Sequence, residues 1–172
     1  MSAAINAALS ELQCTLLELP GTAAIARQRL AGDPIGRQIK VTQGDFLKDV
    51  LPKEYDIVLL AHVVHVLVPE QNLQLLRQAR RAVTLGARLL MVDFWMDPRH
   101  TQPLMGALMA GEFLVVGGNG DVYSVEEARK WLEQSGWRYV EHKPLSGPVT
   151  LLVAEAIDSG VSTPSASQAS GE

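Results

Sequence analysis

The hydrophobic pattern of the chain alternates between short, uniformly apolar runs and longer stretches in which apolar residues recur every three or four positions. Runs that are apolar on both faces are typical of strands in a parallel sheet covered by helices. They predict strands at 14–17, 39–42, 56–61 and 88–94. Two later runs, at 137–141 and 149–155, predict a closing antiparallel pair, because proline and glycine residues join them.

The stretches with helical periodicity lie between these runs. They predict helices at 3–12, 23–30 and 103–116. They also predict one helix that begins at Pro69 and ends before Gly86, and one that begins at 125 and stops at Gly136. Thr22 is the expected cap of the second helix, and residues 124–127 (SVEE) form a capping box before the last one. That last helix is expected to bury Ala128, Trp131 and Leu132. Alternating strands and helices predict an α/β fold with a doubly wound, mostly parallel sheet.

Composition sets the domain organisation. The chain has 172 residues, of which 47% are hydrophobic, and this is enough to build a core for one domain, expected at 1–156. Residues 157–172 are rich in Ser, Thr, Ala, Gln and Gly and show no periodicity, so they predict a disordered tail.

Charge, cysteine content and hydropathy exclude several classes of protein. The formal net charge is -4 and the basic residues are scattered, which argues against nucleic-acid binding. The single cysteine, Cys14, forms no internal disulfide and suits a reducing compartment. The longest apolar run, 57–68, is too short to cross a membrane, and the first residues do not resemble a secretion signal. We therefore expect a cytoplasmic protein that does not bind membranes.

Candidate binding residues follow the apolar runs, because ligands of doubly wound sheets bind beyond the carboxyl ends of the strands. Glu18 ends the first run, and its two carboxylate oxygens match the two hydroxyls of a ribose. Asp45 and Phe46 follow the second run, where a carboxylate can meet an adenine amino group and a ring can stack on the base. A solvated acid at the end of a strand and an ordinary Gly-Asp turn remain alternatives.

Two histidines, His62 and His65, follow the third run. Their spacing suits a metal pair on a helix, but a third ligand is needed and the sequence is not HExxH. A single general base is the better interpretation, since imidazole titrates near neutral pH, and a histidine satisfied within the core remains an alternative. Asp93, at the end of the fourth run, is placed to orient such a base from the neighbouring strand. The stretch 117–120 (GGNG) is interpreted as a flexible turn, because it lacks the spacing of a phosphate-binding loop.

Taken together, the chain resembles the catalytic domain of the S-adenosylmethionine-dependent O-methyltransferases, a group that includes plant phenolic and bacterial polyketide enzymes. The matching segments are 16–30, 41–83, 86–96 and 120–145. The resemblance implies S-adenosyl-L-methionine as cofactor and a small-molecule hydroxyl acceptor, phenolic or polyketide-like. It also implies the residue roles. Glu18 would bind the ribose, Asp45 and Phe46 the adenine, His65 would deprotonate the acceptor, and Asp93 would steady His65.

The chain departs from the family pattern in three places. Val66 stands where members often carry aspartate, and His62 occupies a position usually filled by other residues. In the family, the first strand and its glycine-rich loop precede the segment at 16–30, so we expect a partial catalytic domain. That strand is central, and its absence would leave unpaired backbone groups on two strands. Direct pairing, a strand from another chain or truncation would each account for it.

Two functions from different classes follow. The first is an O-methyltransferase with His65 as general base. The alternative is a catalytically impaired remnant that acts as an oligomeric or partner-binding module, since unpaired strands favour association, including into a homo-oligomer. A nicotinamide-linked oxidoreductase ranks last, because it would need the same glycine-rich loop.

Overall fold

The computed structural model describes residues 12–158, which form two compact units that divide between Leu51 and Pro52. Each unit is described by itself. The helix expected at 3–12 and the tail expected at 157–172 lie almost wholly outside the described residues. No helix in the described part of the chain is long and apolar enough to cross a membrane.

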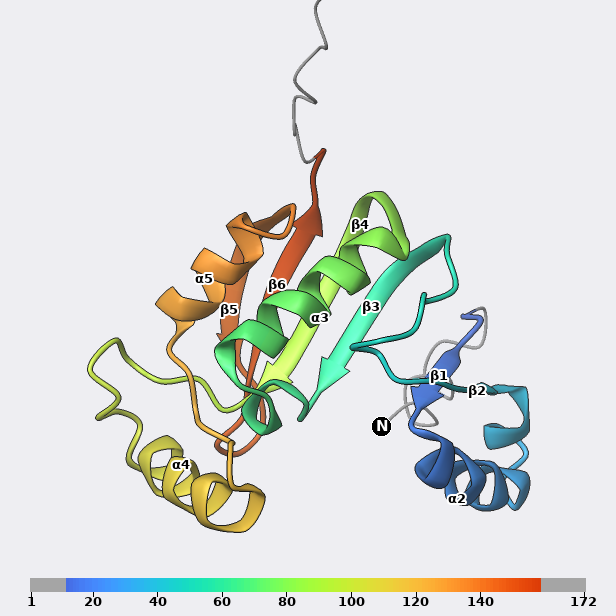
Figure 1. Ribbon diagram of the computed structural model, residues 1–172, viewed down its shortest axis with the longest axis horizontal. Helices are drawn as coiled ribbons and strands as arrows, with labels where there is room; N and C mark the ends of the chain where they lie inside the picture. Colours follow the sequence, from blue (N-terminus) through green and yellow to red (C-terminus); the bar gives the residue numbers. More distant parts are fainter. Residues whose placement is uncertain (1–11, 159–172) are drawn as a thin grey trace, which may run out of the picture. The chain divides into compact units, whose positions relative to one another are not determined.

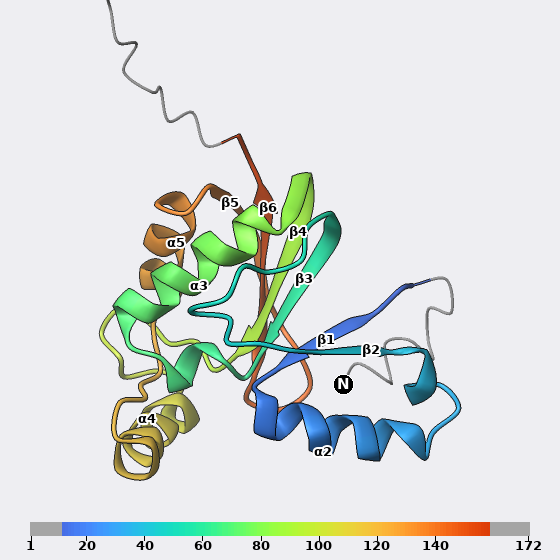
Figure 2. The ribbon, with the colours of Figure 1, turned by 45° about the vertical axis from the view of Figure 1, so that its right-hand side comes forward.

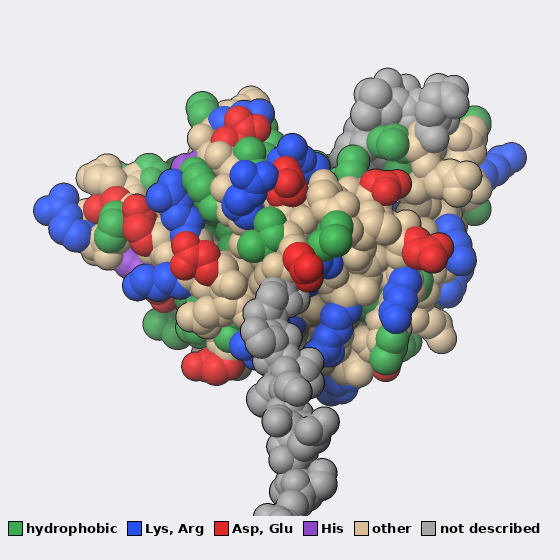
Figure 3. All heavy atoms as spheres, turned by 90° about the horizontal axis from the view of Figure 1, so that it is seen from above, with side chains coloured by type: hydrophobic (Ala, Val, Ile, Leu, Met, Phe, Trp, Pro, Cys, Tyr) green, Lys and Arg blue, Asp and Glu red, His purple; other side chains and the backbone are tan. Residues whose placement is uncertain are grey.

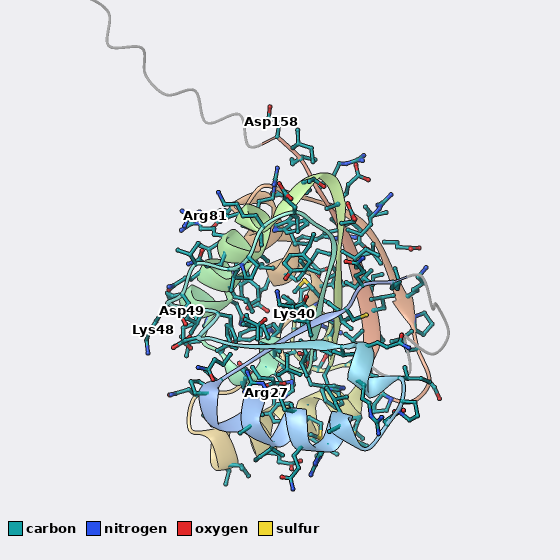
Figure 4. All side chains as sticks on the ribbon, turned by 90° about the vertical axis from the view of Figure 1, so that its right-hand side faces the viewer. Arg27, Lys40, Lys48, Asp49, Arg81 and Asp158 are labelled. Atoms are coloured by element: carbon teal, nitrogen blue, oxygen red, sulfur yellow. The ribbon has the colours of Figure 1, made fainter. Side chains whose placement is uncertain are left out.

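The first unit is a parallel strand pair with a crossover helix. Strand β1 (Thr15–Glu18) pairs with β2 (Lys40–Gln43), while α2 (Pro20–Ala31) and the 3-10 turn η1 (Gly36–Gln38) connect them (Figure 2). Arg27 of α2 donates to the Val41 carbonyl at 3.3 Å, which ties the helix to β2 (Figure 4). The predicted cap at Thr22 is wrong. The helix begins at Pro20, whose fixed φ and missing N–H suit the first helical turn.

The second unit contains a four-stranded sheet in the order β3-β4-β6-β5. Its strands are β3 (Tyr55–Ala61), β4 (Val83–Asp93), β5 (Trp137–Pro144) and β6 (Thr150–Ala156). Strands β3 and β4 are parallel, whereas β6 is antiparallel to both β4 and β5. The α/β class and the closing antiparallel pair are confirmed. The predicted sheet, mostly parallel and doubly wound, is wrong for this unit, because the observed sheet is mixed. A short connection between β5 and β6 enforces their antiparallel pairing.

The apolar pattern of strand β3 and the missing neighbouring strand expected from the family gave different predictions for its pairing. Its apolar residues indicated a strand inside a sheet, yet within residues 12–158 it forms one edge of the four-stranded sheet, and Ile57 is 48% exposed.

Two helices cover one face of this sheet, and a third lies at its end. Helices α3 (Pro69–Arg81) and α5 (Val125–Glu133) lie on the same face (Figures 1 and 2). Helix α4 (Leu104–Gly117) and the 3-10 turn η2 (Val64–Val66) lie at the carboxyl ends of β3 and β4 (Figure 1). The core between sheet and helices holds the fully buried side chains of Leu76, Leu89, Met91, Leu132, Trp137 and Leu152.

Local sequence signals set several helix boundaries. The capping box is confirmed: Glu127 N–H donates to Ser124 Oγ at 3.2 Å, and the Glu127 carboxylate accepts from Ser124 N–H at 2.8 Å. Ala128, Trp131 and Leu132 are buried as predicted. Val83, expected in a helix, instead begins β4.

On the face that Figure 3 shows, acidic and basic side chains are interspersed.

Candidate active site

The candidate site begins where β3 and β4 end side by side. Ala61 pairs with Val92 in the parallel register, and His62 N–H donates to the Val92 carbonyl at 2.9 Å. Asp93 is the last residue of β4 and shares the helix-covered face with Leu89 and Met91, since side chains alternate along a strand. Asp93 and the turn that carries His65 thus lie at the carboxyl ends of two neighbouring parallel strands.

His65 and Asp93 form a buried hydrogen-bonded pair. His65 Nδ1 lies 2.7 Å from Asp93 Oδ1, and the two residues are 8% and 1% exposed. Because a carboxylate only accepts hydrogen bonds, this contact places the proton of a neutral imidazole on Nδ1 and leaves Nε2 as the acceptor nitrogen. The N–H groups of Val64 and Phe94 also donate to Asp93, at 3.1 Å and 2.9 Å. These bonds compensate the cost of burying the carboxylate.

The turn that carries His65 is fixed by donors from other segments. Asn72 Nδ2 on α3 donates to the carbonyls of Val64 and Leu67, at 3.0 Å and 3.2 Å. Tyr123 Oη donates to the Leu67 carbonyl at 2.6 Å. Burial, helped by nearby carboxylates, raises the pKa of Tyr123 to about 12, so this donor keeps its proton at neutral pH. Sequence reasoning missed Asn72 and Tyr123, since neither lies at the end of a strand.

Helix α4 and the turn after it close around the histidine. The Phe113 ring stacks on the His65 ring with centroids 3.9 Å apart and planes inclined by 13°. Asp121 N–H donates to the His65 carbonyl at 3.0 Å. A Cβ added at Gly120 would lie 2.6 Å from that carbonyl oxygen and 2.8 Å from Phe113 Cβ. The turn at 117–120 therefore contains a glycine required for close packing against His65, and the GGNG string was its only sequence signal.

His62 is exposed beside this pair. Its ring centroid is 5.9 Å from that of His65, and its φ of 55° is unusual for a residue other than glycine. One ligand atom from each of His62, His65 and Asp93 lies within 4.8 Å of the others. Asp93 is thus the third potential metal ligand that the sequence pattern lacked.

The first unit holds the other candidates. Glu18 is the half-buried last residue of β1, and its carbonyl accepts from Gly44 N–H at 2.9 Å. Asp45 accepts from Leu47 N–H at 2.9 Å and pairs with Lys48 at 3.0 Å, and these contacts lower the pKa of its carboxyl group. Phe46, beside it, is half-buried. Figure 4 labels Lys48 and Asp49, which belong to the same segment after β2 as Asp45 and Phe46.

The family of the chain follows from comparison with known proteins. The O-methyltransferase domain family matches residues 1–138, and the chain belongs to this family. Among curated relatives, the S-adenosyl-L-methionine-dependent methyl transferase PigF of a Serratia species is 29% identical over 153 residues, covering 88% of this chain and 44% of that protein. The structure of PigF with SAH has a TM-score of 0.82 at 28% identity and covers 90% of this chain and 46% of that one.

Two further relatives, both from Streptomyces, differ in their reactions. A mitomycin biosynthesis 6-O-methyltransferase of Streptomyces lavendulae is 31% identical, covering 88% of this chain and 43% of that protein. The aclacinomycin 10-hydroxylase RdmB of Streptomyces purpurascens is 41% identical over 93 residues, covering 54% of this chain and 25% of that protein. The chain thus spans less than half the length of these relatives.

Proposed function

We propose that the protein is an S-adenosyl-L-methionine-dependent O-methyltransferase that transfers a methyl group to a hydroxyl of a small molecule. Membership of the O-methyltransferase domain family supports this reaction. The observation that carries it is the 2.7 Å contact between His65 Nδ1 and Asp93 Oδ1, because it prepares the other ring nitrogen of the histidine to accept a proton.

His65 is the proposed general base. Its Nε2 takes the proton of the acceptor hydroxyl, and Asp93 stabilises the imidazolium that forms and holds the ring orientation. The stacked Phe113 ring limits rotation of the imidazole. When bound, the cofactor supplies a methyl group already activated on a sulfonium centre, so that positioning and proton removal remain for the protein.

Cofactor binding is proposed for the ends of β1 and β2. The chemistry of the donor set fits a nucleoside: the carboxylate of Glu18 accepts hydrogen bonds from ribose hydroxyls, and Asp45 accepts from an adenine amino group. A lowered pKa keeps Asp45 in its accepting, ionised form. Phe46 offers an aromatic face for the base. The name of PigF and the SAH in its structure support this cofactor.

The proposed acceptor is a phenolic or polyketide-like hydroxyl. The mitomycin biosynthesis O-methyltransferase among the relatives supports an acceptor of natural-product type. A non-catalytic module is not favoured, because it gives no reason for the hydrogen bonds that fix His65 and Asp93 in a buried position.

Calorimetric titration with SAH and with S-adenosyl-L-methionine tests the proposal. We expect heat of binding with the wild type and its loss in Glu18→Ala, while Glu133→Ala, an exposed carboxylate on α5, behaves as the wild type. No heat at millimolar ligand would exclude the enzyme function for this chain.

A hydroxylase is the second candidate, because the 10-hydroxylase RdmB is the relative with 41% identity. Mass spectrometry of products from a panel of phenols, incubated with S-adenosyl-L-methionine in air, separates the two. We expect products that gain a methyl group. Products that gain oxygen instead would favour the hydroxylase.

A further inference from the structure

The cluster of His62, His65 and Asp93 contains more ligand groups than proton transfer needs. We propose that these three residues form a binding site for a divalent transition-metal ion of the Zn²⁺ type, and that the bound ion inactivates His65 as a base. The geometry of the three residues supports the metal site. The inhibition of His65 also depends on the proposed function, in which His65 is the base.

The ligand set matches such an ion. Two imidazoles and one carboxylate are typical of zinc sites that keep a fourth position open, and imidazole selects Zn²⁺ over Mg²⁺ or Ca²⁺. One ligand atom of each residue already lies within 4.8 Å of the others. Ligands on one tetrahedral ion are roughly 3.3 Å apart, given bonds of about 2.0–2.1 Å. His65 Nδ1 and Asp93 Oδ1, now 2.7 Å apart, must therefore separate slightly, and the larger movement falls on His62, whose exposed side chain can rotate.

The surroundings hold two of the ligands in place. Val64 N–H and Phe94 N–H donate to the Asp93 carboxylate at 3.1 Å and 2.9 Å, which is the kind of support that ligating carboxylates receive in metal sites. His65 is fixed through its carbonyl, which accepts from Asp121 N–H, and through the stacked Phe113 ring. Most of the ordering that the ion requires therefore falls on His62.

Binding has a defined consequence for His65. As Nδ1 and Asp93 Oδ1 separate from their present 2.7 Å, the ion takes the place of the proton between them, and the ring binds it as the other neutral tautomer. The single proton of the neutral imidazole then lies on Nε2 instead of Nδ1, so that Nε2 donates a hydrogen bond and cannot accept the hydroxyl proton. The methyl-transfer mechanism does not use His62. The proposed metal site gives this histidine a role, as a ligand beside the base.

The test is calorimetric titration of the untagged chain with zinc chloride in a buffer that does not bind metals. The Cys14→Ser background removes the thiol as a competing ligand. We expect one ion per chain, and affinity more than about tenfold weaker in His62→Asn, because one ligand is lost. Asparagine tolerates the positive φ at this position, so the variant keeps the backbone. His142→Asn, on β5, is the matched control and should bind as the background does.

Two results overturn the metal site: no zinc binding to the background protein, or equal binding by His62→Asn. Activity measured separately tests the consequence. Zinc should lower the rate of methyl transfer, EDTA should restore it, and His62→Asn should be less sensitive relative to its own rate without zinc. Zinc binding that depends on His62 in a chain without methyl transfer would reject the proposed function and leave the metal site in place.

Discussion

His65 is positioned by groups that come from four different parts of the second unit. Asp93 fixes its ring nitrogen, Phe113 covers its face, and Asp121 binds its carbonyl. Asn72 binds the carbonyl of the preceding residue. Because each contact restrains a different part of the residue, single substitutions around it should affect the rate of methyl transfer more than they affect cofactor binding.

The Asp93→Asn variant tests the orientation of the base. An amide has one acceptor oxygen for the three donors that Asp93 now satisfies, so a buried donor loses its partner. We expect urea denaturation to show a loss of about 1–3 kcal/mol in the free energy of unfolding, and the transfer rate to fall about 10²-fold or more. Asp56→Asn, at an exposed carboxylate on β3, should change neither. An Asp93→Asn enzyme as active as the wild type would reject the orienting role.

The Gly120→Ala variant tests the close packing of the turn after α4. A methyl group there would meet the His65 carbonyl and Phe113 Cβ at distances below 3.0 Å, so the backbone near His65 must shift. We expect the transfer rate to fall by at least about tenfold, since misplacing a catalytic group by a fraction of an ångström is costly. At Gly117 an added Cβ meets no atom within 4 Å, so Gly117→Ala should retain the wild-type rate. Equal rates for both variants would contradict this role of Gly120.

The sequence predicted some of these residues and not others, for a physical reason. His62 and His65 follow one apolar run and Asp93 ends the next, so the meeting of parallel strand ends placed them at one edge, while the choice of His65 as base came from the family resemblance. Asn72, Phe113 and Gly120 act through tertiary contacts made by a helix face and a turn. Their local sequence looks like ordinary helix and loop, and only the packing shows their role.

At the scale of elements, α5 depends on its capping box. Ser124 Oγ accepts from Glu127 N–H, one of the amides that a helix start leaves without a partner. We expect Ser124→Ala to lower the free energy of unfolding by about 1 kcal/mol, measured by urea denaturation. Ser124→Asp, which preserves an acceptor at the cap, should recover part of this loss. An unchanged stability in Ser124→Ala would show that the cap is unimportant.

The same box predicts a pH dependence. Burial acts to raise the pKa of Glu127, but hydrogen bonds from Ser124 and the pairing with His100 outweigh it, so the pKa lies below its ordinary value of 4.5. A depressed pKa stabilises the fold above the unfolded value, and this contribution is lost as the pH falls through the folded value. The free energy of unfolding should therefore fall more steeply below about pH 4.5 in the wild type than in Glu127→Gln. Parallel profiles would contradict this coupling.

Element boundaries were predictable where a local signal dominates. The capping box predicted the start of α5, because its two hydrogen bonds form within one helical turn. At α2 two signals competed, and the fixed φ of Pro20 set the start rather than the hydroxyl of Thr22. Val83 kept the helical period of α3 but joins β4, because pairing with the distant Tyr55 competes with local helix formation.

At the scale of the whole molecule, the chain divides into two compact units at Leu51. The sequence predicted the α/β class from alternating periods. It predicted the closing antiparallel pair but not the strand order, in which β6 also pairs antiparallel with β4, because strand pairing depends on contacts between residues far apart in the chain.

A fragment of residues 52–158 tests the independence of the second unit. This unit contains the four-stranded sheet, the helices that cover it and every contact of His65 described above. We expect the fragment to unfold cooperatively in urea and to retain a low-field imidazole N–H resonance from the His65 contact to Asp93, absent in an Asp93→Ala fragment. A fragment without cooperative unfolding would show that the second unit needs residues 1–51.

Whether His65 is the base of a methyl transfer is decided by comparing the kcat of wild type and His65→Gln with one phenolic acceptor, measured in EDTA. We expect a kcat about 10²–10⁴-fold lower in the variant, with the affinity for SAH unchanged. A variant that transfers methyl groups at the wild-type rate would contradict it.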